Sequence, residues 1–202
     1  EARIFLQNPE LQQRMKEEGL KDAHELQSWF ITRMEKYINS KGRSIIGWDE
    51  ILEGGLAPNA AVMSWRGEAG GIEAAKSGHY VVMSPGSHCY LDHYQAEPAT
   101  QPLAIGGFTS LAKIYGYEPV PASLNAEEAK YIMGAQGNVW TEYIPNSAHV
   151  EYMVYPRAAA LSEVVWSPKE SRNYDSFMER MQSVIKRYYA YGINFSRVEF
   201  LK

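Results

Sequence analysis

The feature that most constrains the fold is a set of four short apolar runs, none of which alternates with polar residues as a half-exposed strand would. The runs cover residues 44–48, 60–65, 80–84 and 132–140. Continuous hydrophobicity over such short lengths is typical of strands buried on both faces, as in a parallel sheet. Segments of helical periodicity surround the runs, at residues 1–19, 22–40, 147–165 and 173–191. We therefore predict an α/β fold with a parallel sheet.

The segments between the predicted strands differ in length, and their lengths constrain the connections. Only about a dozen residues separate the first two strands, which is near the minimum for a parallel crossover, so we expect a short helix there or none. Residues 94–121, between the third and fourth strands, are rich in Pro, Gly and Thr and indicate a long loop, after which Asn125 is a candidate helix N-cap. We find no repeat and no interdomain linker, so residues 1–202 are predicted to form one domain or part of one.

Each run is followed by aromatic and charged residues that a hydrophobic core does not need. These clusters are Trp48–Glu50, Trp65–Glu68, Tyr90–His93 and Trp140–Glu142. In parallel α/β folds the functional groups lie at the carboxyl ends of the strands. We therefore predict that the four clusters contribute to one site.

The pair Trp140 and Glu142 indicates what this site binds. Residues two apart on a strand point to the same face. An indole beside a carboxylate suits a sugar, because the ring packs on C–H groups while the carboxylate accepts hydrogen bonds from hydroxyls. The same spacing recurs in two further pairs, Tyr90 with Asp92 and Trp48 with Glu50. The alternative is a core tryptophan beside a solvated glutamate, but three such pairs favour a carbohydrate site.

Charge and hydropathy exclude other partners. The chain has 20 basic and 24 acidic residues, a formal net charge of −4, which argues against a nucleic-acid partner. No apolar run approaches the ~20 residues of a membrane span, so we predict no membrane partner.

Other kinds of chemistry lack their sequence patterns. Four potential ligands lie close together, His88, Cys89, Asp92 and His93. They match no common zinc spacing, so we predict no metal, and we predict no cofactor. The segment Gly67–Gly71 lacks the Lys and Ser/Thr of a phosphate loop and is predicted to be a tight turn. The absence of a Gly-x-Ser-x-Gly elbow argues against a serine hydrolase. Arg157 is expected to anchor a helix rather than to contact a ligand.

Four motifs occur in order along the chain, Gly47–Leu52, Ser64–Gly67, Tyr90–Asp92 and Gly137–Glu142. Together they resemble the carboxyl-terminal half of a glycoside hydrolase family 20 catalytic domain, the β-N-acetylhexosaminidase family. The resemblance covers nearly the whole chain, and Tyr155–Arg157 and Leu161–Glu163 fit the last barrel helix. It implies a (β/α)8 TIM barrel to which residues 1–202 contribute about the last four strands, as a catalytic domain truncated at its N-terminus.

The resemblance also assigns roles to particular residues. It implies that Trp48, Trp65 and Trp140 form a pocket around the acetamido methyl group of a terminal N-acetylhexosamine. Tyr90 matches a catalytic tyrosine that donates a hydrogen bond to the acetamido carbonyl oxygen. Asp92 and Glu142 match positions that bind sugar hydroxyls. In this family the acetamide oxygen of the substrate attacks the anomeric carbon, so the reaction is substrate-assisted and retaining.

The sequence departs from the family at one decisive point. It lacks the adjacent Asp-Glu pair of the His-x-Gly-Gly-Asp-Glu motif, which orients the acetamide and supplies the general acid, and it lacks the sugar-binding arginine of the first strand. Asp49–Glu50 belongs to a later strand and does not replace that pair. We expect the pair just upstream of Glu1 and predict that the isolated chain is inactive. We also expect its open sheet edges to self-associate or to be covered by other chain segments. Localisation stays open, although a periplasmic or secreted protein suits the family.

Three hypotheses follow. The protein that carries this chain is an exo-acting β-N-acetylhexosaminidase, or it is a non-catalytic N-acetylhexosamine-binding domain, or it is another glycosidase that uses Asp49 or Glu50 with Glu142. The first depends on one spatial prediction, that the three tryptophan rings converge with the phenol of Tyr90.

Overall fold

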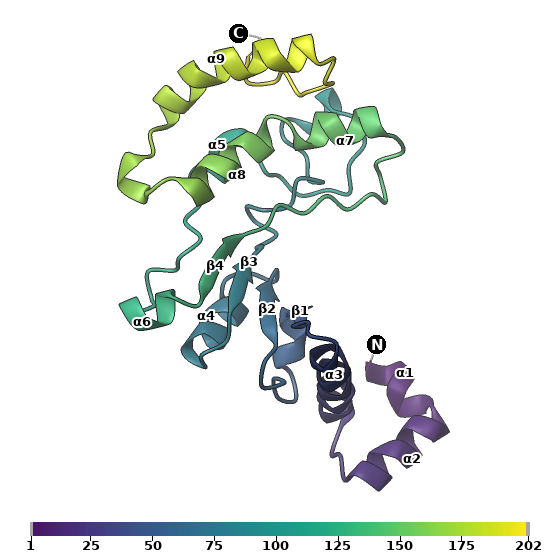
Figure 1. Ribbon diagram of the computed structural model, residues 1–202. Coiled ribbons are helices and arrows are strands. Elements are labelled where there is room, and N and C mark those ends of the chain that lie inside the picture. The colour runs from purple at the N-terminus through teal and green to yellow at the C-terminus, as the bar shows by residue number, and fades with distance from the viewer. Residues whose placement is uncertain (1, 201–202) are drawn as a thin grey trace. The chain divides into compact units, whose positions relative to one another are not determined.

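The computed structural model describes residues 2–200, which form an α/β fold as predicted (Figure 1). The strands are β1 (Ile46–Trp48), β2 (Ala61–Ser64), β3 (Val81–Met83) and β4 (Ile132–Ala135). The α-helices are α1 (Ala2–Gln7), α2 (Pro9–Glu18), α3 (Ala23–Ser40), α4 (Ala69–Lys76), α5 (Leu111–Tyr115), α6 (Ala126–Ala129), α7 (Ser147–Val154), α8 (Arg157–Trp166) and α9 (Tyr174–Ala190). The short 3₁₀ helices are η1 (Asp49–Leu52), η2 (Pro98–Thr100) and η3 (Lys169–Ser171). None of the helices among these residues is both long enough and apolar enough to cross a membrane.

The strands form one sheet in which the spatial order β1-β2-β3-β4 follows the chain. β1 and β2 are parallel, with Trp48 opposite Met63. The connection between them holds only η1, which confirms the expected short crossover. α4 joins β2 to β3 and packs against β2. The predicted N-cap Asn125 is also confirmed, because its side chain accepts hydrogen bonds from the first turn of α6.

The prediction that all four strands are buried on both faces is wrong for the outer strands. Ile46 in β1 is 45% exposed and Met133 in β4 is 65% exposed. In β2 and β3, by contrast, Val62, Val81 and Met83 are fully buried. In the described chain each outer strand pairs on one side only. The hydrophobicity of a single run does not encode the position of its strand within the sheet.

The chain divides into two compact units. The N-terminal unit comprises residues 1–82 and 122–133, and the C-terminal unit comprises residues 83–121 and 134–202. The division passes through β3 and β4, so each unit carries part of both strands.

In the N-terminal unit, the helix predicted over residues 1–19 is two helices, α1 and α2. Pro9 stands in the first turn of α2, where its missing N–H is tolerated. The side chain of Asn8 accepts hydrogen bonds from the first N–H groups of that helix. Gly19, the last residue of the predicted helical segment, ends α2 with a φ of 67°, and Asp22 caps α3.

The helix predicted over residues 147–165 of the C-terminal unit is also interrupted. Pro156 lacks an N–H, and its ring disfavours helical geometry at the residue before it. Tyr155 is accordingly extended, with φ −101° and ψ 134°. α7 therefore ends at Val154 and α8 begins at Arg157.

In the C-terminal unit α9, which is yellow in Figure 1, lies above α5 and α8 in that view. The buried side chains of α9 recur at helical spacing, and they are Phe177, Met181, Ile185 and Tyr188. The ring of Phe177 lies 4.8 Å from that of Tyr115 in α5, measured between centroids. This aromatic contact joins the last helix to the rest of the unit.

We predict that Phe177→Ala destabilises the protein by about 3–5 kcal/mol, because it removes a buried ring and leaves a cavity. Phe177 is 3% exposed. The control is Tyr191→Ala, which removes a ring that is 79% exposed and should change stability little. Urea unfolding followed by circular dichroism measures both variants. Equal midpoints for the two would contradict the packing of α9 described above.

Candidate active site

The residues predicted from the sequence fall into two groups, one in each unit. Trp48 is the last residue of β1 and Trp65 follows β2, both in the N-terminal unit. The second group lies in the C-terminal unit, in the segments that follow β3 and β4, and consists of Tyr90, Asp92, Trp140 and Glu142. Each group is described by itself, and the meeting of the two groups in one pocket stays a prediction.

In the first group, Glu50 contacts Trp65. Both carboxylate oxygens of Glu50 lie 3.0 Å from the indole Nε1 of Trp65, which donates the hydrogen bond. The prediction that Trp48 and Glu50 share a strand face is wrong, because β1 ends at Trp48 and η1 begins at the next residue. The contact joins the ends of two neighbouring strands. Glu50 lies in η1, which follows β1, and Trp65 follows β2, whose last paired residue with β1 is Met63 opposite Trp48.

Asp49 holds the backbone that carries Trp65. Its side chain is 2% exposed, and its Oδ2 accepts hydrogen bonds from the N–H groups of Trp65 at 2.8 Å and Arg66 at 3.1 Å. Its Oδ1 accepts a further hydrogen bond from Nε of Arg66. Nη1 of Arg66 lies 2.6 Å from Glu53, and this hydrogen bond lowers the pKa of the Glu53 carboxyl. The same two carboxylates, Glu53 first, raise the pKa of Arg66, so the guanidinium stays charged.

The tight turn predicted over Gly67–Gly71 is wrong for its second half, because α4 begins at Ala69 and includes Gly70 and Gly71. Gly67 precedes the helix with a φ of 128°, which suits glycine. The hydroxyl of Ser64 donates to the carbonyl of Gly67 at 2.8 Å and accepts from the N–H of Gly71 at 2.9 Å. A Cβ on Gly70 would lie 2.8 Å from the Cβ of Asp49, so glycine allows α4 to approach η1 closely. The loop after β2 is therefore fixed at both ends.

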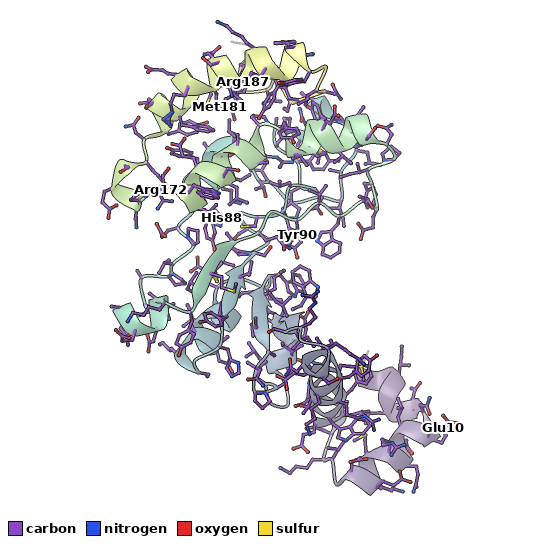
Figure 2. All side chains as sticks on the ribbon, in the orientation of Figure 1. Glu10, His88, Tyr90, Arg172, Met181 and Arg187 are labelled. Atoms are coloured by element: carbon purple, nitrogen blue, oxygen red, sulfur yellow. The ribbon has the colours of Figure 1, made fainter. Side chains whose placement is uncertain are left out.

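In the second group, Tyr90, which Figure 2 labels, pairs in parallel with Asn138. The N–H of Leu91 donates to the carbonyl of Asn138 at 2.7 Å, and the N–H of Asn138 donates to the carbonyl of Cys89 at 2.7 Å. The Asn138 side chain also donates to the hydroxyl of Ser84 at 2.8 Å. These bonds fix the segment of Tyr90 against the segment that leads to Trp140. The sequence analysis missed Asn138, whose only sequence signal is a polar residue inside an apolar run.

The strand geometry from which the sequence predicted a shared face is absent for these two pairs as well, so that their spacing does not establish a shared face. Asp92 lies in a turn, and β4 ends at Ala135, well before Trp140 and Glu142. Trp140 is 41% exposed and Glu142 is exposed, so the indole is not a core side chain.

Asp92 is 3% exposed, and its Oδ1 has no hydrogen-bond partner among the described residues. Burial raises the pKa of its carboxyl, and the negative charge of Glu142 raises it further. Hydrogen bonds from backbone N–H groups, including that of Trp140, and the charge of Arg157 act in the opposite direction. A buried polar atom without a partner is costly, so Oδ1 is suited to accept a hydrogen bond from a ligand.

Arg157 is fully buried and anchors several segments, which confirms its predicted role. Its guanidinium donates to the carbonyl oxygens of Leu91, of His93 at 3.1 Å and of Thr109 at 2.8 Å, and to that of Met153 at the end of α7. Two of these carbonyls flank Asp92 in the chain. Burial lowers the pKa of Arg157 to about 9, and the charge of Asp92 opposes that shift.

The nearby histidines and cysteine have other contacts. A ring nitrogen of His93, Nδ1, lies 3.1 Å from the hydroxyl of Thr109, and the ring of His88 stacks on Tyr117 at 4.9 Å. Cys89 is buried, which raises the pKa of its thiol to about 12. Within residues 2–200, no group of three or more His, Cys, Asp or Glu side chains is arranged to hold a metal ion.

Comparison with known proteins points to one family. The family model described as "Glycosyl hydrolase family 20, catalytic domain" matches residues 1–169. A beta-hexosaminidase of Porphyromonas gingivalis is 49% identical over 185 residues, which cover 91% of this chain and 24% of that protein. A beta-N-acetylhexosaminidase of Cellulomonas fimi is 31% identical over 147 residues, which cover 71% of this chain and 29% of that protein.

Solved structures agree with these relatives. The GH20 exo beta-N-acetylglucosaminidase of Vibrio harveyi, in complex with N-acetylglucosamine, matches with a TM-score of 0.84 at 29% identity. The match covers 95% of this chain and 30% of that chain. A beta-N-acetylhexosaminidase of Bacteroides fragilis matches with a TM-score of 0.80 at 25% identity, over 95% of this chain and 40% of that one. The chain thus spans between about a quarter and two fifths of the length of these four proteins.

We predict that Asp92→Asn stabilises the folded protein at neutral pH, and that this advantage disappears in acid. When the pKa of a carboxyl is higher in the folded state than in the unfolded state, ionisation of that group opposes folding. The folded protein therefore loses stability as the pH rises above the unfolded pKa of about 3.9. Asparagine keeps the shape and has no such ionisation. The measurement is the difference in unfolding free energy between wild type and variant, followed over roughly pH 3–8, the range in which the Asp92 carboxyl ionises in the unfolded and folded states.

The matched control is Asp175→Asn, which removes an exposed carboxylate at the start of α9. The inference that burial of the Asp92 charge is destabilising would be contradicted by either of two results. One is a difference in unfolding free energy between wild type and Asp92→Asn that does not change with pH, and the other is a wild type that is more stable than the variant at neutral pH.

Proposed function

Because the chain belongs to glycosyl hydrolase family 20, we propose that the protein carrying it hydrolyses terminal, non-reducing, β-linked N-acetylhexosamine residues. The observation that carries the proposal is Asp92, a buried carboxylate whose Oδ1 is unpaired among the described residues and whose segment is paired with the one leading to the exposed ring of Trp140. An acceptor beside an accessible indole is what a sugar hydroxyl and the adjacent C–H face require. The Vibrio harveyi relative in complex with N-acetylglucosamine supports the same ligand class.

In this proposal the tryptophans surround the N-acetyl group. Trp48, Trp65 and Trp140 contact the acetamido methyl, and the hydroxyl of Tyr90 donates a hydrogen bond to the acetamido carbonyl oxygen. That oxygen attacks the anomeric carbon, so the nucleophile belongs to the substrate. Holding the two reacting atoms together is worth an effective concentration of up to ~10⁵–10⁸ M. The resulting oxazolinium ion is opened by water with retention of configuration.

Asp92 and Glu142 bind the remaining hydroxyls of the same sugar. Their environments differ, because Asp92 is buried and held between carbonyls that Arg157 fixes, whereas Glu142 is exposed. Asp92 is therefore the more precisely placed acceptor, and Glu142 the more adaptable one.

The proposal assigns the general acid to the Asp-Glu pair of the family motif, which these 202 residues do not contain. We propose that the chain is the C-terminal part of a (β/α)8 barrel, with about the last four strands, and that the preceding part supplies that pair. The parallel sheet with strands in chain order supports this placement.

Two alternatives differ in what they require. A non-catalytic N-acetylhexosamine-binding domain would lack an Asp-Glu pair in its full sequence and would bind the sugar without turnover. A glycosidase that uses Asp49 or Glu50 needs a carboxylate free to reach substrate. The contacts of Asp49 with the backbone of Trp65 and Arg66, and of Glu50 with the indole, oppose that hypothesis.

We predict that Tyr90→Phe, in the protein that carries this chain, lowers kcat by roughly 10²-fold, the loss typical of one donor to a developing charge. KM should change much less, because the hydrogen bond strengthens as the ring closes. Release of nitrophenol from an aryl β-N-acetylglucosaminide measures both constants. Tyr191→Phe, at a position 79% exposed, is the control. An unchanged kcat in Tyr90→Phe would remove this residue from the mechanism.

We further predict that residues 1–202 alone release no nitrophenol above background. Loss of a general acid alone costs typically ~10²–10⁴-fold in rate. The comparison is between this chain and the protein that carries it, at equal molar concentration. Turnover by the isolated chain would show that its own carboxylates suffice and would favour the hypothesis based on Asp49 or Glu50.

A further inference from the structure

We propose that Glu50 is a positioning residue that fixes the indole of Trp65, and that it thereby sets the size of the N-acyl group that the pocket accepts. The inference rests on the proposed function, in which Trp65 is one wall of the N-acetyl pocket. It adds a residue that does not itself touch the substrate.

The first step is that the backbone of Trp65 has little freedom. Oδ2 of Asp49 accepts hydrogen bonds from the backbone N–H groups of Trp65 and Arg66. The guanidinium of Arg66 donates a hydrogen bond to Oδ1 of the same carboxylate. The hydroxyl of Ser64 then closes the loop through Gly67. With its backbone held on both sides, Trp65 can change the wall of the pocket only by rotating its side chain.

The second step is that Glu50 restrains that rotation. The indole has one donor, Nε1, and both oxygens of Glu50 lie 3.0 Å from it. Hydrogen bonds to an ionised carboxylate are roughly twice as strong as neutral ones, so rotating the ring away is unfavourable. The backbone of Glu50 is itself held, because Nε2 of Gln27 in α3 donates to its carbonyl at 2.7 Å. The residue that restrains the indole is therefore itself held in place.

The third step connects ring orientation with selectivity. A tight wall rejects one extra methylene by about 10- to 200-fold, and a wall that can turn rejects it less well. Glu50 should therefore matter most when the enzyme distinguishes an N-acetyl from an N-propionyl substrate. A purely structural residue would lower activity toward both substrates alike.

The experiment compares Glu50→Gln, Glu50→Ala and the control Glu73→Ala in the protein that carries this chain. Glu73 is an exposed carboxylate of α4 in the same unit. The readout is the ratio of kcat/KM for the aryl N-acetyl- and N-propionyl-β-glucosaminides. We expect Glu50→Ala to reduce this ratio by about 10-fold, near the lower limit for one methylene. Glu50→Gln, whose amide oxygen still accepts the indole N–H, should keep a ratio close to wild type, as should Glu73→Ala.

A second measurement does not depend on turnover. The indole N–H of Trp65, assigned by its loss in Trp65→Phe, should exchange with solvent faster in Glu50→Ala than in wild type or Glu50→Gln. Circular dichroism confirms that each variant is folded. Unchanged exchange in a folded Glu50→Ala protein overturns the inference, and so does an unchanged acyl ratio in an active one.

The outcomes separate this inference from the proposed function. Abolished turnover in Glu50→Gln, with wild-type exchange at Trp65, would make Glu50 an acid or base and overturn both proposals. A wild-type protein that does not hydrolyse the N-acetyl substrate contradicts the proposed function and, with it, the role in acyl selectivity. The exchange measurement would then still decide whether Glu50 holds the indole.

Discussion

Two buried side chains of opposite charge hold the loops that follow the strands, and both groups of site residues depend on them. Beyond the last residue of a strand the sheet no longer pairs the backbone, and a buried polar group left without a partner costs about 1–3 kcal/mol. In the N-terminal unit Asp49 accepts the N–H groups of two successive residues. In the C-terminal unit Arg157 donates to four carbonyl oxygens. A negatively charged side chain thus pairs with backbone N–H donors in the N-terminal unit, and a positively charged one pairs with carbonyl acceptors in the C-terminal unit.

This arrangement allows large aromatic side chains to stay accessible without making the loops that carry them flexible. Trp140 is 41% exposed, yet the segment before it is held by the backbone and side chain of Asn138. Asp92 shows the other consequence, because the carbonyls on either side of it are engaged by Arg157 while its own Oδ1 stays unpaired among the described residues. In both cases the contacts that hold the segment are made mainly by its backbone groups.

Much of the secondary structure could be predicted from local sequence, because its signals are local. Asn125 caps a helix as predicted, and Asp22 and Asn173, the first residues of two predicted helical segments, are N-caps as well. Gly19, the last residue of another predicted segment, ends α2. The two interrupted helices carried equally local signals, Asn8 followed by proline and Tyr155 followed by proline, which outweigh the continuous helical periodicity around them. Burial of whole strands could not be predicted in this way, because it depends on which strands lie at the edges of the sheet.

The candidate site shows where local reasoning stops. A spacing of two residues along the chain grouped Trp48 with Glu50, but the chain turns into η1 after Trp48. The contact that does form joins Glu50 in η1 to Trp65 after β2. Parallel pairing of β1 with β2 brings the segments that leave the two strands to the same end of the sheet, and the turn into η1 then directs the carboxylate of Glu50 to the indole. This contact therefore depends on strand pairing and on the turn after β1, and a spacing along the chain encodes neither.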